Sequence, residues 1–291
     1  VVRELTAEQN VALIDLHKSS MQLLERVGAD ESKKIFLWIK PDLYTAIRAG
    51  KEDNTHFTEF GALKIARLVA EGLKELNLPL SKHIQALDEL TMFGLGKTVC
   101  LDEYYNSEWR KNAKGQSERY HYVWDDTTNS GFSILGSMIV NLGASIDTLC
   151  EAPTDRNLTR ASIYVIVDPD TPLENEHPNY LEQPAIDAIE RWVKNGGVLM
   201  LMENDKGNAE FEHLNRLAER FGMHFNEDSR NKVIGNAYDT GKFDSFPDHP
   251  LFKGVRQIYM KEISTLKVQD PATSLFTDKD DVIIAFAKVG K

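Results

Sequence analysis

Cysteine, excess positive charge and long apolar runs are all scarce in this chain of 291 residues. Its cysteines are Cys100 and Cys150, too few for a disulfide-dense secreted scaffold or a four-cysteine metal site, although one disulfide or two free thiols both fit. The formal net charge of −11 argues against nucleic acid or an anionic membrane surface as a partner, because both are bound through basic side chains. No apolar run approaches the roughly 20 residues that cross a bilayer.

The two ends of the sequence lack the features of natural ends. There is no signal-peptide pattern at the start, and the chain opens at Val1 without a methionine. It closes at 282–291, VIIAFAKVGK, just as an expected strand ends. We therefore expect a piece of a longer protein, with further domains or missing catalytic residues outside it.

The first part of the chain alternates strand-like and helix-like segments. The stretch 11–16, VALIDL, predicts a strand, and 17–28 predicts a helix closed by Gly28. The apolar residues of 58–76 recur at helical spacing and predict an amphipathic helix. Asp53 and His56 come just before this helix. We expect them in the loop that leads into it, where a rigid helix holds exposed side chains in place.

An aspartate and a histidine in one loop can act together in acid–base chemistry. A histidine becomes a general base when a carboxylate holds one ring nitrogen and the other faces a hydroxyl nucleophile. The spacing alone is common, and most such pairs are helix caps or surface residues. Here the surrounding residues, DNTHFTEFGALKIARLVAEGL, closely resemble the last block of the SGNH/GDSL hydrolases, within them the rhamnogalacturonan acetylesterase group.

This resemblance covers about residues 1–85, and the stretches 11–20 and 35–38 fit the same group. It implies an incomplete SGNH-hydrolase domain of flavodoxin-like fold, with Asp53 and His56 as the acid and base of a Ser-His-Asp triad. It also implies that Gly61 and Ala62 bring the helix close to the sheet. The sequence departs from the family because it contains no Gly-Asp-Ser block. We therefore expect the serine, and the oxyanion-hole residues, to be missing from this chain.

The second part of the chain predicts a parallel sheet between helices. Strands are expected at 97–105, 162–170 and 198–205, and helices at 130–143, 184–197 and 208–222. Because the strands are apolar along their length, we expect a sheet that is buried on both faces. Residues 86–96 would form a linker between the two domains.

This part resembles a class I glutamine-amidotransferase-like domain, of flavodoxin-like fold, that accompanies pectin-degrading enzymes such as unsaturated rhamnogalacturonyl hydrolases. The resemblance is carried by 97–109, KTVCLDEYYNSEW, and by 129–132, 165–171, 196–222 and 225–231. The domain would span 97–291 and be truncated at its C-terminus. Amidotransferase chemistry needs a cysteine on a strand-to-helix turn. The turn after 198–202 has none, and both cysteines are expected as buried strand residues, so we expect no glutamine hydrolysis.

Polar side chains follow two of the predicted parallel strands, at the edge where open α/β sheets bind ligands. These candidate ligand-binding residues are Asp168, Asp170, Glu203, Asn204, Asp205 and Asn208. Their side chains suit hydrogen bonding to sugar hydroxyls, and aromatic residues of 104–109 and 120–124 could stack on sugar rings. A calcium site and a solvated loop are the alternatives, of which we favour the loop. We expect neither a metal nor a cofactor.

Together these features predict an α/β protein of three-layer parallel-sheet domains. It would be a piece of a multidomain carbohydrate O-acetylesterase that acts on a pectic polysaccharide or oligosaccharide, inactive by itself for lack of the nucleophile. Its other partners would be further domains of the same parent chain. The alternative is a non-catalytic carbohydrate-binding or domain-docking module associated with an unsaturated rhamnogalacturonyl hydrolase. The family resemblance alone implies a periplasmic or secreted location.

Overall fold

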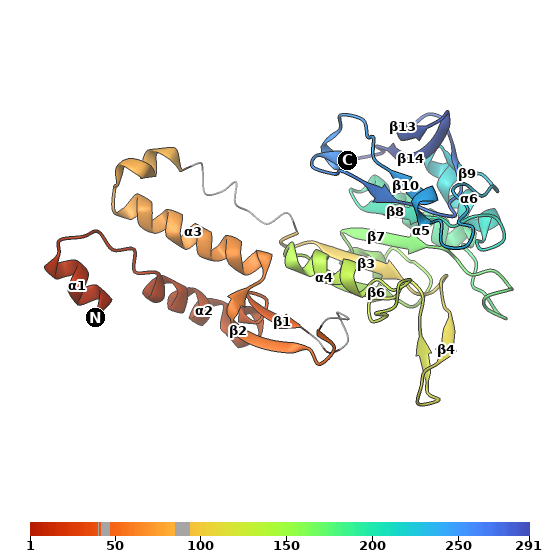
Figure 1. The fold of residues 1–291 in the computed structure, drawn as a ribbon. Coiled ribbons are helices and arrows are strands. Elements are labelled where there is room, and N and C mark those ends of the chain that lie inside the picture. Colours follow the sequence, from red (N-terminus) through yellow and green to blue (C-terminus); the bar gives the residue numbers. More distant parts are fainter. Residues whose placement is uncertain (40, 42–46, 85–93) are drawn as a thin grey trace. The chain divides into compact units, whose positions relative to one another are not determined.

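The computed structural model describes residues 1–39, 41, 47–84 and 94–291, and the chain divides into two compact units (Figure 1). Unit 1 comprises Val1–Lys97 and Trp124–Ser145, and unit 2 comprises Thr98–Val123 and Ile146–Lys291. Most of the linker expected at 86–96 lies outside the described residues. The domain boundaries drawn from the sequence therefore stay a prediction.

Unit 1 is built from helices and one short sheet. Strands β1 (Phe36–Ile39) and β2 (Lys51–Phe57) pair with each other in antiparallel fashion. The expected helix over 58–76 is confirmed as α3 (Glu59–Glu75), and the Thr58 hydroxyl caps it by accepting a hydrogen bond from the Gly61 N–H at 3.1 Å. The remaining elements are α1 (Val2–Glu8), α2 (Leu16–Ser32), the 3-10 turn η2 (Pro79–His83) and α4 (Ser133–Asn141).

Several expectations for this unit are wrong. Residues 11–15 form no strand, and α2 begins at Leu16 because the Asp15 side chain caps it, accepting from the Lys18 N–H at 3.1 Å. The expected end of a helical stretch at Gly28 is confirmed, because the φ of 82° there interrupts α2 and a second helical stretch follows the kink. The family resemblance implies a parallel sheet, whereas within the described residues β1 and β2 pair only with each other, antiparallel.

Unit 2 contains the expected parallel sheet, in the order β6-β3-β7-β8. Strand β3 (Thr98–Asp102) pairs in parallel with β7 (Ile163–Val167), which pairs in parallel with β8 (Val198–Met202). Strand β6 (Ser145–Leu149) lies beyond β3. Helices α5 (Gln183–Lys194) and α6 (Phe211–Ala218) bury their apolar faces in the same core. The α/β fold class is therefore confirmed.

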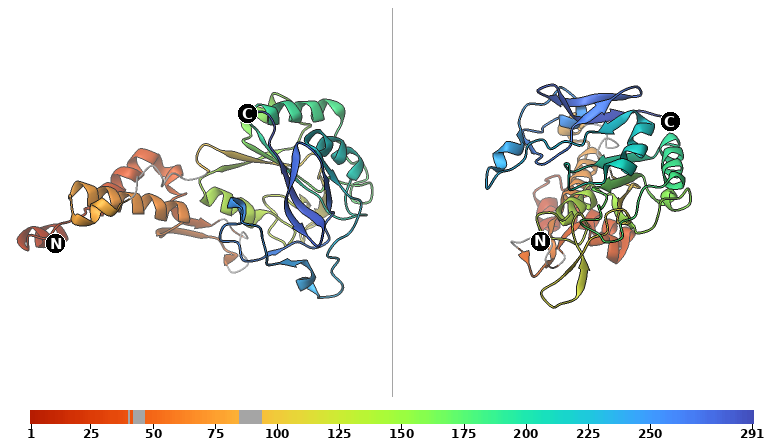
Figure 2. Two further views of the ribbon diagram at one scale, coloured as in Figure 1. Left: turned by 90° about the horizontal axis from the view of Figure 1, so that it is seen from above. Right: turned by 90° about the vertical axis from the view of Figure 1, so that its right-hand side faces the viewer.

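A second sheet in unit 2 was not predicted. It is antiparallel, in the order β13-β14-β12-β9, and consists of β13 (Ala272–Asp278), β14 (Asp281–Ala287), β12 (Leu266–Val268) and β9 (Met223–Phe225). The shorter elements are β4 (Trp109–Lys111), β5 (Ser117–Arg119), β10 (Lys242–Phe243), β11 (Ile258–Tyr259) and the 3-10 turns η4 (Asn157–Arg160), η5 (Glu219–Phe221), η6 (Tyr238–Gly241) and η7 (Pro250–Phe252). The C-terminus lies beside α5 (Figure 2), where the Lys291 N–H donates to the Lys194 carbonyl at 3.2 Å.

The burial expected for the parallel sheet holds for its centre but not for its edge. Strand β7 is buried from Tyr164 onward, whereas Val198 and Met200 of β8 are 54% and 48% exposed. The reason is topological, because β8 is the last strand of the sheet and, among the strands that the structure describes, pairs only with β7. Across the described residues, we find no helix with both the length and the apolar character needed to cross a bilayer.

Candidate functional site

Asp53 and His56 lie within strand β2, not in the loop expected for them. The strand is irregular at this point, because one residue of β1 faces residues 53–56 of β2, between the pairs Trp38–Glu52 and Phe36–Phe57. Bulges of this kind redirect side chains away from the regular alternation of a strand. The two side chains can therefore meet although they are three residues apart.

The carboxylate of Asp53 is held by four donors. Its Oδ1 accepts from the backbone N–H groups of Thr55 at 2.7 Å and His56 at 2.9 Å. Its Oδ2 accepts from the ring Nδ1 of His56 at 2.7 Å and pairs with Nζ of Lys51 at 2.8 Å. The Lys51 ammonium, followed by the two backbone N–H groups and the imidazole, holds the pKa of Asp53 well below its ordinary value. Asp53 is therefore a carboxylate at neutral pH.

This contact fixes the tautomer of the neutral His56 ring. An ionised carboxylate can only accept, so Nδ1 carries the proton and Nε2 is left as an acceptor. The His56 side chain is 71% exposed, whereas that of Asp53 is 9% exposed. Within the described residues Nε2 makes no hydrogen bond. The pair thus presents a basic nitrogen to solvent, backed by a largely buried carboxylate.

Helix α3 anchors the end of β2. The Thr58 hydroxyl donates to the Lys34 carbonyl at 2.6 Å, next to the start of β1. A Cβ atom on Gly61 would lie 1.9 Å from the carbonyl oxygen of Ile35, so the first turn of α3 approaches this backbone as closely as the resemblance implies. Ala62 is exposed, so the packing role expected for it is wrong.

A second candidate site lies where the parallel strands of unit 2 end. The loops after these strands are joined by backbone hydrogen bonds, from the Asp170 N–H to the Tyr105 carbonyl and from the Asp168 N–H to the Met202 carbonyl, both at 2.9 Å. Asp102, the last residue of β3, accepts from the Tyr105 N–H at 2.8 Å. These contacts hold the three loops together as one edge.

Asp168 and Asp170 are buried at this edge, and Glu203 is half-buried with both carboxylate oxygens shielded from solvent. Oδ1 of each aspartate and both carboxylate oxygens of Glu203 have no hydrogen-bond partner within the described residues. Burial raises the pKa of Asp168 to about 8 and that of Asp170 to about 6, and it raises the pKa of Glu203 well above its ordinary value. Burial therefore favours the protonated forms of these carboxyl groups.

The other three predicted ligand-binding residues make contacts within the protein. Asn204 lies beside Asp168, and its Nδ2 donates to the Asp168 Oδ2 at 3.4 Å. Nδ2 of Asn208 donates to Oδ1 of Asp205 at 2.7 Å, and the Ser229 hydroxyl donates to Oδ2 of Asp205. These contacts use both oxygens of Asp205 and the amide nitrogen of Asn208.

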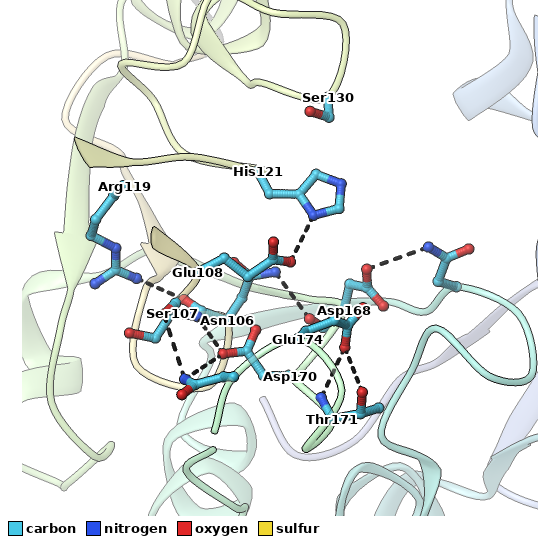
Figure 3. Close-up of polar contacts among 12 residues, drawn as sticks. Asn106, Ser107, Glu108, Arg119, His121, Ser130, Asp168, Asp170, Thr171 and Glu174 are labelled. Atoms are coloured by element: carbon cyan, nitrogen blue, oxygen red, sulfur yellow. Dashed lines mark hydrogen bonds and ion pairs between the residues drawn. The ribbon is translucent and has the colours of Figure 1, made fainter. Parts of the chain in front are cut away.

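Sequence reasoning missed Glu108 and His121 at this edge. Oε1 of Glu108, which is buried, lies 2.8 Å from the ring Nδ1 of His121 (Figure 3). This hydrogen bond raises the pKa of His121 above its ordinary value. The segment 120–124 was identified only by its aromatic residues, and a histidine between two tyrosines was the available signal.

The cysteines differ in their surroundings. Cys100 is buried in β3 as expected, and burial raises the pKa of its thiol to about 12. Cys150 is exposed, contrary to expectation, because it comes just after the last residue of β6. Both thiols are free. In the part of the chain that the structure describes, no three His, Cys, Asp or Glu side chains are arranged to hold a metal ion.

No protein-family model matches the chain. Over 83 residues, 28% of its length, it is 45% identical to rhamnogalacturonan acetylesterase RhgT and 39% identical to the probable rhamnogalacturonan acetylesterase YesY, both of Bacillus subtilis (strain 168). The chain spans 36% and 34% of these two relatives, about a third of each. A comparison with solved structures finds the mmIFT52 N-terminal domain, with a TM-score of 0.46 and 15% sequence identity. The match covers 62% of this chain and 72% of the mmIFT52 chain. Part of this chain is therefore similar to carbohydrate esterases.

Proposed function

We propose that residues 1–85 belong to a carbohydrate O-acetylesterase in which Asp53 and His56 are two members of a Ser-His-Asp triad. The observation that carries this proposal is the 2.7 Å hydrogen bond between Nδ1 of His56 and Oδ2 of Asp53, with the ring exposed beyond it. The similarity to two acetylesterases supports the reaction class. The matched stretch is 83 residues long. This length is close to that of residues 1–85, over which the family resemblance around the DNTHF motif extends.

In this proposal, Nε2 of His56 removes the proton from a serine hydroxyl as its oxygen attacks the acetyl carbonyl carbon. Asp53 holds the ring and stabilises the imidazolium that forms. The imidazolium then gives its proton to the sugar oxygen as the bond between that oxygen and the acetyl carbon breaks. The sugar departs, and the serine now carries the acetyl group. A water molecule, activated by the same ring, hydrolyses this ester and releases acetate.

The serine and the oxyanion-hole donors must come from outside this sequence, which has no Gly-Asp-Ser block. We therefore propose a multidomain parent protein that removes acetyl groups from a pectic polysaccharide, and we expect the present chain by itself to be inactive. Hydrolysis of 4-nitrophenyl acetate by this chain, if blocked by a serine-directed phosphonate, would contradict that expectation.

The test uses the full-length gene product and acetylated rhamnogalacturonan, with acetate release as the readout. We expect His56→Ala to lower kcat by a factor on the order of a million, the size seen when a triad histidine is removed. Asp53→Ala should cost less, on the order of ten thousand, because the carboxylate orients the base without transferring the proton.

His83→Ala is the matched control, because His83 is an exposed histidine of the same unit and should keep full activity. If the His56→Ala enzyme is as active as the unaltered protein, the triad assignment is wrong.

A further inference from the structure

Five acceptor oxygens at the carboxyl edge of the parallel sheet are buried without a hydrogen-bond partner in the described residues. They belong to Asn106, Asp168, Asp170 and Glu203. Asp168 is 4% exposed and Asp170 is 1% exposed. Buried acceptors are nearly always paired in folded proteins, because leaving one unpaired costs the desolvation of that group. This edge therefore offers acceptors for donors that the described part of the chain does not supply.

Two of these side chains, Asn106 and Asp170, are fixed through their other polar atoms. Nδ2 of Asn106 donates to the Asp168 carbonyl at 3.0 Å. Oδ2 of Asp170 accepts from the Ser107 N–H at 3.0 Å and from Nδ2 of Asn175 at 2.8 Å. Figure 3 shows Asn106, Asp168 and Asp170 gathered below the His121 ring. The unpaired oxygens of Asn106 and Asp170 are thus held in fixed positions.

Aromatic rings accompany these acceptors. The His121 ring stacks on Tyr122 with a centroid distance of 4.2 Å and an interplanar angle of 17°, and on Tyr120 at 5.8 Å and 15°. The carboxyl group of Asp168 acts to raise the pKa of both His121 and Tyr122, so both rings lie within electrostatic range of it. A flat aromatic surface beside hydrogen-bonding groups suits a ligand with an apolar face and a polar rim.

The charge of the edge restricts the class of ligand. The negative charges of Glu174 and Glu108 act on Asp168, and that of Glu174 also acts on Glu203, so the edge disfavours a further negative charge. A divalent cation is disfavoured by geometry, because no three acidic or histidine side chains in the described ranges converge on one point. A neutral ligand whose hydroxyls both donate and accept satisfies carboxylates and protonated carboxyls alike.

We propose that this edge, with unpaired acceptors on Asn106, Asp168, Asp170 and Glu203, binds a neutral, hydroxyl-rich ligand of the sugar class. The site excludes uronic acids by charge. Its acceptors are shielded from solvent in the free chain. All of these residues belong to unit 2, so the proposal is independent of the esterase assignment.

Isothermal titration of the complete 291-residue chain tests the proposal with three probes: a neutral oligosaccharide of rhamnose and galactose, an oligogalacturonate of the same length, and calcium chloride. We expect binding of the neutral sugar alone. Glu203→Met removes two unpaired oxygens at nearly constant volume, so binding should weaken at least about tenfold while the melting temperature stays equal or rises. Glu176→Met, the same change at an exposed position of the loop after β7, should bind normally.

A second readout needs no substitution. In a nitrogen-15 spectrum the neutral sugar should shift the side-chain amide signals of Asn106 and Asn204, which contact Asp168. The amide of Asn215, which donates to the Phe225 carbonyl elsewhere in the core, should not move. The proposal is overturned if the neutral sugar fails to bind, or if either oligogalacturonate or calcium binds as tightly as the neutral sugar. It is also overturned if Glu203→Met leaves the affinity of the chain for the neutral sugar unchanged.

Discussion

Lys51 and His56 both contact Oδ2 of Asp53, and the lysine has the larger effect on this carboxylate. We predict that Lys51→Met raises the pKa of Asp53 towards its ordinary value, because the strongest contact to the charged form is lost. A carbon-13 titration of the Asp53 carboxyl measures this directly. Lys74→Met, at an exposed position in the last turn of α3, is the control and should leave the titration unchanged. A Lys51→Met titration that coincides with that of the unaltered chain would refute the prediction.

At the scale of single residues, the sequence could predict Asp53 and His56 as a pair because a local motif contains both. It could not predict the contact between Glu108 and His121, which are 13 residues apart, on either side of the β4–β5 hairpin. Nor could it separate Asp168, which keeps an unpaired oxygen, from Asp205, whose oxygens are both used. The difference depends on Asn208 and Ser229, and the spacing of acidic residues does not reveal it.

Among the helices, α3 offers a matched pair of glycines. A Cβ atom on Gly61 would meet the Ile35 carbonyl oxygen at 1.9 Å, whereas one on Gly72 would meet the Ile14 side chain at 2.6 Å. Glycine-to-alanine changes inside helices normally stabilise by about 1 kcal/mol. We predict that Gly61→Ala instead destabilises unit 1 by about 1–3 kcal/mol, because backbone atoms must move. Gly72→Ala should be milder, since a side chain can rotate away.

Hydrogen exchange of the α3 amides measures both variants. We expect the Gly61→Ala chain to be less stable than the Gly72→Ala chain. Equal or greater stability of the Gly61→Ala chain would contradict this.

The helices and the central strands could be predicted because their apolar periodicity is local and strong, as α3 and β7 illustrate. The strand predicted for 11–16 is wrong. Its apolar residues suit a strand, but the Asp15 side chain caps a helix that begins at the next residue. The bulge at 53–56 and the edge position of β8 depend on which strands pair, and strand pairing is not encoded in either segment alone.

For the whole molecule, we predict that the two units respond differently to pH. The pKa of Asp168 is raised to about 8, so the folded state keeps a proton that the unfolded state releases near pH 4. The stability of unit 2 should therefore fall as pH rises from about 4 to about 8, by at most about 1.4 kcal/mol per pH unit for this group. Asp170, and His121 through its contact with Glu108, act in the same direction.

Unit 1 should not show this trend. The pKa of Asp53 is lowered, so its contribution is complete above about pH 4 and is lost only in more acidic solution. Hydrogen exchange of the Ile166 and Ala66 amides at pH 5 and pH 8, corrected for intrinsic rates, compares the units. Asp168→Asn should flatten the dependence at Ile166. Equal protection of Ile166 at both pH values would disprove the prediction.

The unequal surroundings of the two cysteines make the unaltered chain suitable for site-selective labelling. The Cys150 thiol is exposed, while the Cys100 thiol is buried in β3. A maleimide at mildly alkaline pH therefore attaches a fluorophore or spin label at a single position after β6, with no cysteine to remove first. Leu80→Cys, at an exposed position of unit 1, then adds a second labelling site. The two labels report on the two units in one sample.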